Sequence, residues 1–358
     1  MNKNSDLGYS EFFEKARQEI GLGDFSVARV VSEQKGLYKV RNETGEYLSK
    51  IRGKQIFDAT SREDYPAVGD WVTLTELENQ EAVIEKVLPR KTVIKRKKSG
   101  SDEVQIIATN IDVAFIVESV NRDYSLNRLE RYFSIVRDGG VKPVVILNKI
   151  DLISKEELDL KIEQIKNRFK EVEVFSTSVK NSQGVDDLKN FLEKGKTYCF
   201  LGSSGVGKSS LINQLIGKDE IKTGDIGESA DRGKHVTTNR EMYFLQSGAI
   251  VIDNPGIREV GIADAGTGVE DSFDEIVFLA KECKYSDCSH VHEPGCRVLE
   301  ALKEGDLDEG KYSNYIDLKK ESEHYSMNQV QKREKNRQFG KFMKKTKKEF
   351  KKYGHRGY

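Results

Sequence analysis

Nine consecutive residues in the second half of the chain have the composition of a phosphate-binding loop. Residues 202–210 read GSSGVGKSS, which fits the pattern G-x-x-x-x-G-K-[ST]. An apolar, strand-like stretch precedes the loop and a helical pattern follows it, which is the context that such a loop requires. Glycines let backbone N–H groups turn toward phosphate oxygens, and the N-terminus of the following helix adds a positive dipole.

The whole loop is therefore predicted to hold the phosphates of a nucleotide. Lys208 should reach the β- and γ-phosphates and take part in catalysis, and the Ser209 hydroxyl should ligate Mg²⁺. The predicted contacts are Gly202, Ser203, Ser204, Gly205, Val206, Gly207, Lys208, Ser209 and Ser210. Cys199 lies in the preceding strand-like stretch, where a buried structural thiol is expected.

A second motif specifies the base, which a phosphate loop alone does not. Asn148-Lys149-Ile150-Asp151 follows the apolar stretch 143–147, where a strand is expected to end. A carboxylate at Asp151 can accept hydrogen bonds from the N1–H and N2–H₂ groups of guanine, and adenine lacks this pair of donors. The motif resembles the NKxD motif of translation-factor and Ras-like GTPases. That resemblance implies that Asn148 contacts the other edge of the base, and that the Lys149 stem lies against its face.

Residues 177–180 read TSVK and resemble the second guanine loop of the same proteins. The resemblance places Ser178 at the base and lets the backbone N–H of Val179 meet the guanine O6. Taken alone, the NKID residues could be a helix N-cap that matches the motif by chance. The phosphate loop in the same chain makes that alternative less favoured.

The motifs occur in an unusual order. Asp253-Asn254-Pro255-Gly256 resembles the DxxG motif, in which Asp253 would hold Mg²⁺ through water and the Gly256 backbone would sense the γ-phosphate. Between the phosphate loop and this motif, either Thr237 or Thr238 would ligate Mg²⁺, with Thr237 favoured. Because the base motifs precede the phosphate loop, the GTPase motifs are circularly permuted. The segment after Gly256 then runs directly into the C-terminal part of the chain.

The residue just after the DxxG-like motif is not suited to orient the attacking water. Many GTPases carry Gln there, whereas this chain carries Ile257, which can neither donate nor accept a hydrogen bond. His235, between the two phosphate motifs, is the nearest candidate for a catalytic role. The alternative is an exposed loop histidine.

Three of the four cysteines cluster around a histidine. Cys283, Cys288, His290 and Cys296 offer three thiolates and one imidazole, which complete a tetrahedral Zn²⁺ shell with no open position. We therefore expect one structural zinc. His292 is a competing ligand, and reduced buried thiols without metal are the alternative.

Charge is unevenly distributed in a chain whose net charge is zero. Residues 331–358 contain 12 Lys and Arg against 2 Asp and Glu, so this basic tail carries +10 and the remainder carries −10. Phe339, Phe342 and Phe350 are interleaved with the lysines, which favours RNA contact over a merely solubilising end. No apolar run is long enough to span a membrane, and the polar N-terminus has no secretory h-region. A cytoplasmic protein with a polyanionic partner is expected.

The apolar patterning predicts three structured parts. Residues 26–100 contain short strand-like runs typical of a small barrel or sandwich. Residues 101–265 alternate strands and helices in the manner of a doubly wound α/β sheet. Residues 266–330 are helical and contain the cysteine cluster, residues 1–25 form an N-terminal extension, and residues 331–358 are the basic tail.

Taken together, these features resemble the RsgA (YjeQ) family over nearly the whole chain. The resemblance implies an N-terminal OB-fold, a circularly permuted P-loop GTPase core and a C-terminal helical zinc-binding domain. It also implies a monomer that binds GTP or GDP and the rRNA of the small (30S) ribosomal subunit late in maturation, with hydrolysis stimulated by the subunit. One departure is Val236, where family members often carry a threonine.

Two other functions compete with this interpretation. The first is a non-catalytic RNA-binding scaffold in which nucleotide only supports the fold, and Ile257 favours it. The second is a P-loop kinase, which Asp151 and the motif at 253–256 disfavour.

Overall fold

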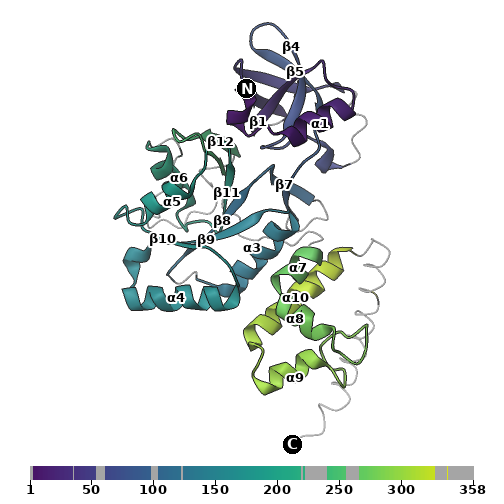
Figure 1. Ribbon diagram of the computed structural model, residues 1–358, viewed down its shortest axis with the longest axis vertical. Helices are drawn as coiled ribbons and strands as arrows, with labels where there is room; N and C mark the ends of the chain where they lie inside the picture. The colour runs from purple at the N-terminus through teal and green to yellow at the C-terminus, as the bar shows by residue number, and fades with distance from the viewer. Residues whose placement is uncertain are drawn as a thin grey trace, which may run out of the picture.

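The chain folds into a β-barrel, a central α/β sheet and a group of C-terminal helices (Figure 1). The computed structural model describes residues 3–34, 36–53, 61–97, 104–121, 124–218, 221, 240–254, 266–326 and 337. Among these residues, no helix is both long and apolar enough to span a membrane.

The N-terminal barrel consists of β1 (Ser26–Gln34), β2 (Leu37–Arg41), β3 (Glu46–Ile51), β4 (Trp71–Glu76) and β5 (Glu81–Val87). It closes because β1 pairs with both β2 and β4, while β3 pairs in parallel with β5. Alternate residues of each strand point inward, so that Tyr38 and Val40 of β2 are buried. The closed five-stranded barrel agrees with the OB-like expectation.

An N-terminal segment covers one end of this barrel. It comprises the 3₁₀ helix η1 (Lys3–Leu7) and α1 (Glu11–Glu19), with Tyr9 between them. The rings of Tyr9 and Trp71 meet edge to face at 4.7 Å. The buried guanidinium of Arg29 donates to the carbonyls of Leu7 at 2.6 Å and Asn110 at 3.1 Å. This arginine thus ties the N-terminal segment and the barrel to the start of the central sheet.

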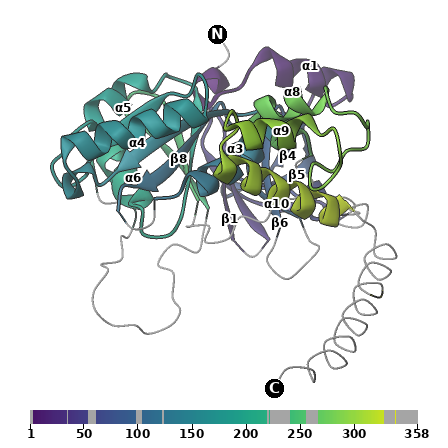
Figure 2. The same cartoon turned by 90° about the horizontal axis from the view of Figure 1, so that it is seen from below.

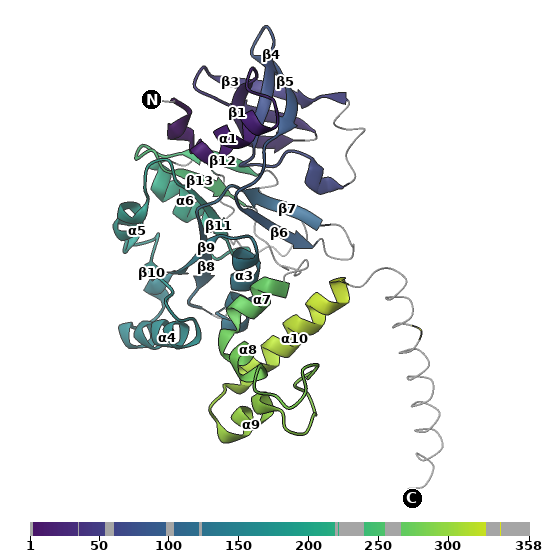
Figure 3. The same cartoon turned by 45° about the vertical axis from the view of Figure 1, so that its right-hand side comes forward.

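A separate two-stranded sheet lies between the barrel and the C-terminal helices (Figure 3). It pairs β6 (Val93–Lys97) with β7 (Val104–Thr109) in antiparallel fashion. A short 3₁₀ helix, η2 (Arg62–Asp64), lies beside β7.

The central sheet has six strands in the order β10-β9-β8-β11-β13-β12. These are β8 (Val113–Ser119), β9 (Lys142–Asn148), β10 (Val174–Thr177), β11 (Thr197–Leu201), β12 (Glu241–Phe244) and β13 (Ile250–Asp253). All pairs are parallel except β12 with β13. Apolar runs at 113–117, 143–147, 172–175, 198–201 and 249–252 indicate five of these strands in the sequence. The sixth, β12, is a short strand that pairs with β13 on one side and with β1 of the barrel, at Ser32 and Glu241, on the other.

Helices cover both faces of the sheet, as the doubly wound pattern predicts. On one face, α3 (Leu126–Asp138) and α4 (Lys155–Arg168) pack against Ala114 and Ile116 of β8. On the other, α5 (Val185–Phe191) and α6 (Lys208–Ile216) pack against Phe115 and Val117. This alternation along one strand explains why β8 is apolar at every position from Val113 to Val117, since both faces of the strand are buried there.

The C-terminal helices are α7 (Gly266–Ser272), α8 (Asp274–Ala280), α9 (Arg297–Glu304) and α10 (Glu309–Ser326). They lie beside α3, and α5 and α6 lie at the far end of the molecule (Figure 2). The α7 backbone approaches α3 so closely that a Cβ on Gly268 would lie 2.0 Å from the Ser134 carbonyl oxygen. Phe273 and Leu318 extend the apolar core that α3 and α4 share with the sheet.

A buried ionic network reinforces this contact. Glu130 of α3 is fully buried, and Arg168 at the end of α4 donates to its two carboxylate oxygens at 2.6 and 3.1 Å. Asn314 of α10 donates to the same carboxylate, and Asp308 accepts a second bond from Arg168 at 2.8 Å. Three helices from distant parts of the sequence therefore converge on one carboxylate.

Candidate functional site

The phosphate loop joins β11 to α6, as the sequence predicts. Gly202 has φ +143°, and a Cβ there would lie 2.3 Å from the Val117 carbonyl oxygen. Gly207 has φ +99°, and a Cβ there would lie 2.3 Å from Nδ2 of Asn148. Both fixed glycines are therefore required by close packing as well as by backbone conformation.

Lys208 begins α6 and its ammonium lies inside the loop. Its Nζ donates to the carbonyl oxygens of Gly202 at 2.9 Å and Ser203 at 2.8 Å. Burial lowers the pKa of Lys208 to about 8, and the nearby Asp253 carboxylate opposes this shift. A buried cation held by loop carbonyls is suited to meet a phosphate anion.

The base motif is attached directly to the phosphate loop. Asn148 ends β9, where Nδ2 donates to the Val206 carbonyl at 2.8 Å and Oδ1 accepts from the Thr177 hydroxyl at 3.1 Å. Lys149 has φ +65°, and its Nζ donates to the Gly205 carbonyl at 2.6 Å. The end of β9 therefore holds the phosphate loop and the end of β10 in register with each other.

Asp151 lies in the short 3₁₀ helix η3 (Ile150–Leu152), immediately before α4. The Ser178 hydroxyl donates to its Oδ1 at 2.6 Å and accepts from the Asn181 backbone N–H at 3.3 Å. Ser178 thus orients the carboxylate that is expected to recognise guanine. Val179 follows in the same loop and is half-buried.

Asp253 ends β13 beside the phosphate loop. Among the described residues, neither of its buried carboxylate oxygens has a hydrogen-bond partner. Burial raises the pKa of Asp253 to about 6, while Lys208 opposes the rise. Unpaired, buried carboxylate oxygens are the donors that Mg²⁺ prefers, so this position fits the expected metal.

Three further residues of the site escaped the sequence analysis. The side-chain amide of Asn254 is buried without a hydrogen-bond partner, next to Asp253. Tyr132 of α3 is buried, and a hydrogen bond with the Ser203 side chain opposes the rise that burial causes in its pKa. Thr177 fixes Asn148. Asn254 and Thr177 each stand inside a motif that the sequence shows, but neither had an assigned contact, and the pattern of α3 marks Tyr132 simply as a core residue.

The remaining predicted site residues lie outside the part of the chain that the structure describes. They are His235, Thr237, Thr238, Gly256 and Ile257. The basic tail, 331–358, also lies outside it apart from Arg337.

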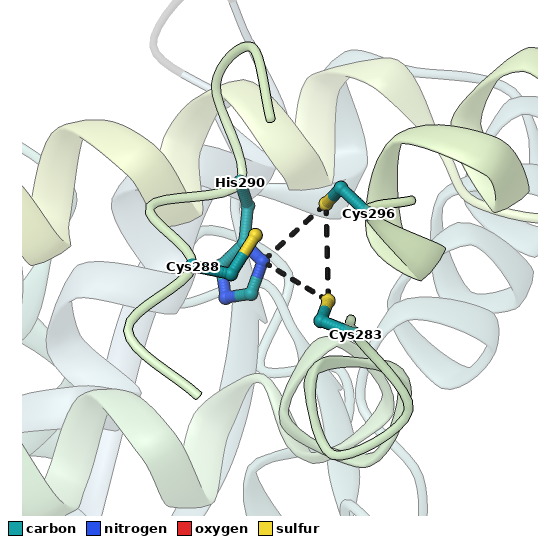
Figure 4. Close-up of side chains that lie close together, drawn as sticks. All are labelled: Cys283, Cys288, His290 and Cys296. Carbon is teal, nitrogen blue, oxygen red and sulfur yellow. Dashed lines mark hydrogen bonds between the residues drawn. The ribbon is translucent and has the colours of Figure 1, made fainter. Parts of the chain in front are cut away.

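The predicted metal ligands come together in the loop between α8 and α9 (Figure 4). Their ligand atoms all lie within 4.8 Å of one another. Sγ of Cys283 lies 3.9 Å from Sγ of Cys296 and 3.6 Å from Nδ1 of His290. Three sulfurs and one nitrogen at this spacing fit a tetrahedral Zn²⁺ site.

The local backbone explains which histidine faces the cluster. His290 is buried with φ +62°, and its carbonyl accepts from the Tyr312 hydroxyl of α10 at 2.7 Å. The Glu293 carboxylate accepts from the Ser289 hydroxyl and from the backbone N–H groups of Ser289, Val291 and His292. The Ser289 hydroxyl is the main cause that lowers the Glu293 pKa, and the backbone donors add to it. His292 itself is exposed, so the competing ligand points away from the cluster.

Comparison with protein-family models gives two matches. The model of the RsgA GTPase matches residues 87–263, and the model of the ABC transporter matches residues 185–352. Both ranges contain the phosphate loop, a motif that many nucleotide-binding proteins share. The guanine motif at Asn148 lies only within the first range.

Curated relatives match nearly end to end. The chain is 38% identical to small ribosomal subunit biogenesis GTPase RsgA 1 of Bacteroides thetaiotaomicron, with 97% of this chain and 98% of that protein covered. It is 39% identical to RsgA 1 of Oceanobacillus iheyensis, with 82% of this chain and 84% of that protein covered.

Solved structures give the same picture of the fold. YjeQ from Thermotoga maritima superposes with a TM-score of 0.60 at 29% identity, covering 84% of this chain and 99% of that one. YloQ, described as a circularly permuted GTPase, superposes with a TM-score of 0.58 at 23% identity, covering 85% of this chain and 97% of that one.

Proposed function

This chain belongs to the RsgA GTPase family, and we propose that it hydrolyses GTP as a late maturation factor of the small ribosomal subunit. The observation that carries the proposal is the contact between Asn148 and Val206, which unites a guanine motif and a phosphate loop in one site. The names of the full-length relatives supply the ribosomal role.

In the proposed site, guanine lies against Lys149, with its N1–H and N2–H₂ groups donating to Asp151. Asn148 and the Val179 backbone meet the opposite edge of the base. The loop residues 202–210 surround the phosphates, and Lys208 leaves its two carbonyl partners to bind the β- and γ-phosphates. Ser209, Asp253 and Thr237 or Thr238 would hold Mg²⁺, which neutralises phosphate charge when bound.

We assign the residues for hydrolysis by asking which one could replace the water-orienting glutamine that many GTPases carry after the DxxG motif. Ile257 cannot orient water, so we assign this role to His235, ordered by the ribosomal subunit. Gly256 would sense the γ-phosphate through its backbone N–H. Slow intrinsic turnover and subunit-stimulated turnover follow from this assignment.

The four ligand side chains at 283–296 are proposed to hold one structural Zn²⁺, because their three sulfurs and one imidazole nitrogen all lie within 4.8 Å of one another. A structural zinc supplies folding free energy. The ligands join α8, the following loop and α9, so the metal would fix the shape of this region.

We further propose the division into an extension (1–25), a barrel (26–100), a GTPase domain (101–265), a zinc domain (266–330) and a basic tail (331–358). The protein would act as a cytoplasmic monomer that binds small-subunit rRNA through basic residues. Because the segment after Gly256 leads into α7, γ-phosphate would shift the zinc domain and favour subunit binding.

Co-sedimentation tests this proposal. The chain, loaded with a non-hydrolysable GTP analogue, should pellet with small subunits and stay in the supernatant with large subunits. Loading with GDP should weaken pelleting. Equal pelleting with both kinds of subunit would overturn the ribosomal assignment, and equal pelleting with both nucleotides would overturn the coupling.

A further inference from the structure

The outer face of α8 and α9 combines exposed apolar surface with acidic charge. A groove of about 420 Å³ is lined by Lys170, Asp274, Glu275, Phe278, Leu279, Arg297, Ala301 and Asp306. Phe278 is 63% exposed, although buried phenylalanine is the norm. Asp274 and Asp306 are exposed at the rim. The groove can therefore take an apolar side chain flanked by cations.

The charge of the surrounding segment disfavours nucleic acid as the occupant, although Lys170 and Arg297 also line the groove. Residues 274–308 contain nine acidic and four basic side chains, a net charge of −5. Two of the groove's charged residues are already paired, since Lys311 binds Glu275 at 2.7 Å and Arg297 binds Glu304 at 3.3 Å. An acidic surface repels phosphate and attracts a basic segment.

The chain itself contains a segment with the matching chemistry. Residues 331–358 carry a net charge of +10 and place Phe339, Phe342 and Phe350 among lysines. The helix α10 starts at Glu309, three residues beyond Asp306, and its 18 residues extend about 27 Å. The 12 residues between Ser326 and Phe339 can span about 40 Å when extended, which is enough to return to the groove.

We propose that the α8–α9 groove binds the chain's own basic tail when no polyanion is present. Phe278 and Leu279 would contact a tail phenylalanine, and Asp274 and Asp306 would face its lysines. RNA competes for the same lysines, so binding of the tail to RNA releases the groove. This docking keeps the tail from non-specific RNA, and it goes beyond the proposed function because it requires neither GTP nor the ribosome.

Anisotropy of a fluorescein-labelled RNA oligonucleotide of random sequence tests the proposal on full-length protein. The groove variant combines Asp274→Asn, Phe278→Ser and Asp306→Asn. A matched control on the exposed face of α4 combines Asp159→Asn, Leu160→Ser and Glu163→Gln, in which Leu160 is 59% exposed. If the docked tail is about 90% populated, the groove variant should bind RNA about tenfold more tightly than wild type. The control should bind like wild type.

A tail variant, Phe339→Ser, Phe342→Ser and Phe350→Ser, separates docking from simple charge repulsion. These phenylalanines are themselves expected to contact RNA, so the readout is the combined variant: adding the groove substitutions to the tail variant should leave its RNA affinity unchanged. Hydrogen exchange of residues 274–280 should rise in wild type when RNA is added, and should already be high in the tail variant. Equal affinities of the groove variant and the control, or a further gain when the groove substitutions are added to the tail variant, would each overturn the proposal.

Discussion

Asn148 is the residue at which the proposed base motif and the phosphate loop meet. Its amide bridges the phosphate loop at Val206 and the end of β10 at Thr177, and it fills the space that a side chain at Gly207 would need. Asn148 is buried, so these hydrogen bonds are shielded from water. They hold the proposed guanine motif and the phosphate loop together as one unit.

Base specificity should depend on Asp151. We expect Asp151→Asn to weaken GTP binding about a hundredfold, since two charge-assisted hydrogen bonds are lost, and to favour xanthine nucleotides, whose C2 carbonyl accepts from an amide. Asp159→Asn on α4 is the control for charge. Competition binding with GTP and XTP measures both effects, and an unchanged preference for GTP would remove Asp151 from the base site.

Nucleotide affinity should depend on pH through Lys208. Burial lowers the pKa of this lysine to about 8 in the free protein, and phosphate binding favours the charged form. Binding must therefore take up a proton above pH 8, and GDP affinity should fall as pH rises through about 8, approaching tenfold per unit. Titration between pH 7 and 9 checks this, and a constant affinity across the range would contradict the buried state of Lys208.

The sequence predicts most of this site because its chemistry is local. Residues 202–210, 148–151 and 253 are positioned by the strand ends that precede them. Tyr132 and Thr177 could not be predicted, since each contacts the site only through tertiary packing. The role of Ser178 in orienting Asp151 likewise depends on two strands that are neighbours only in the folded sheet.

At the scale of elements, α3 connects the nucleotide domain to the C-terminal helices. Its buried face contains Tyr132, and Glu130 receives Arg168 from α4 and Asn314 from α10. The helix α4 begins directly after the guanine motif. The C-terminal helices are therefore fixed to the base-binding side of the site as well as to the segment that follows Gly256.

Removing Arg168 should loosen this connection. Arg168→Ala leaves the Glu130 carboxylate buried without its cation, and should cost about 3 kcal/mol of stability. Lys142→Ala breaks the exposed pair with Glu173 and should cost less than about 1 kcal/mol. Urea unfolding of both variants gives the comparison, and equal costs would show that the network contributes no more than a surface ion pair.

The zinc assignment makes a prediction that distinguishes the two histidines. His290→Ala should remove the metal and destabilise α9 and α10, because His290 lies in the cluster and its backbone contacts Tyr312. His292→Ala should keep about one zinc per chain, since His292 is exposed. Metal analysis of the two purified variants shows which histidine is the ligand. Loss of zinc only in His292→Ala would make His292 the ligand in place of His290.

The elements themselves were largely predictable, and the exceptions have a physical cause. The strands of the central sheet are apolar on both faces and leave a continuous signal, as in β8. The strand β12 has only four residues, Glu241–Phe244, and pairs with β13 on one side and with β1 of the barrel on the other. The β-propensity of these four residues alone could not identify β12 as a strand.

At the scale of the whole molecule, opposite charges are separated along the chain and the nucleotide domain lies between two appended units (Figure 1). Arg29 fastens the barrel to the central sheet through backbone carbonyls. The C-terminal helices are the unit that the segment after Gly256 enters. Nucleotide state should therefore be communicated toward the C-terminal helices more than toward the barrel.

The most direct test of the account is GTP turnover by the purified chain with small subunits, with large subunits and in buffer alone. We predict slow turnover in buffer, no change with large subunits, and a stimulation of at least about a hundredfold with small subunits. His235→Ala should bind GTP and small subunits normally but lose the stimulation. Turnover that is equal under all three conditions would contradict the central claim that this protein is a small-subunit-dependent GTPase.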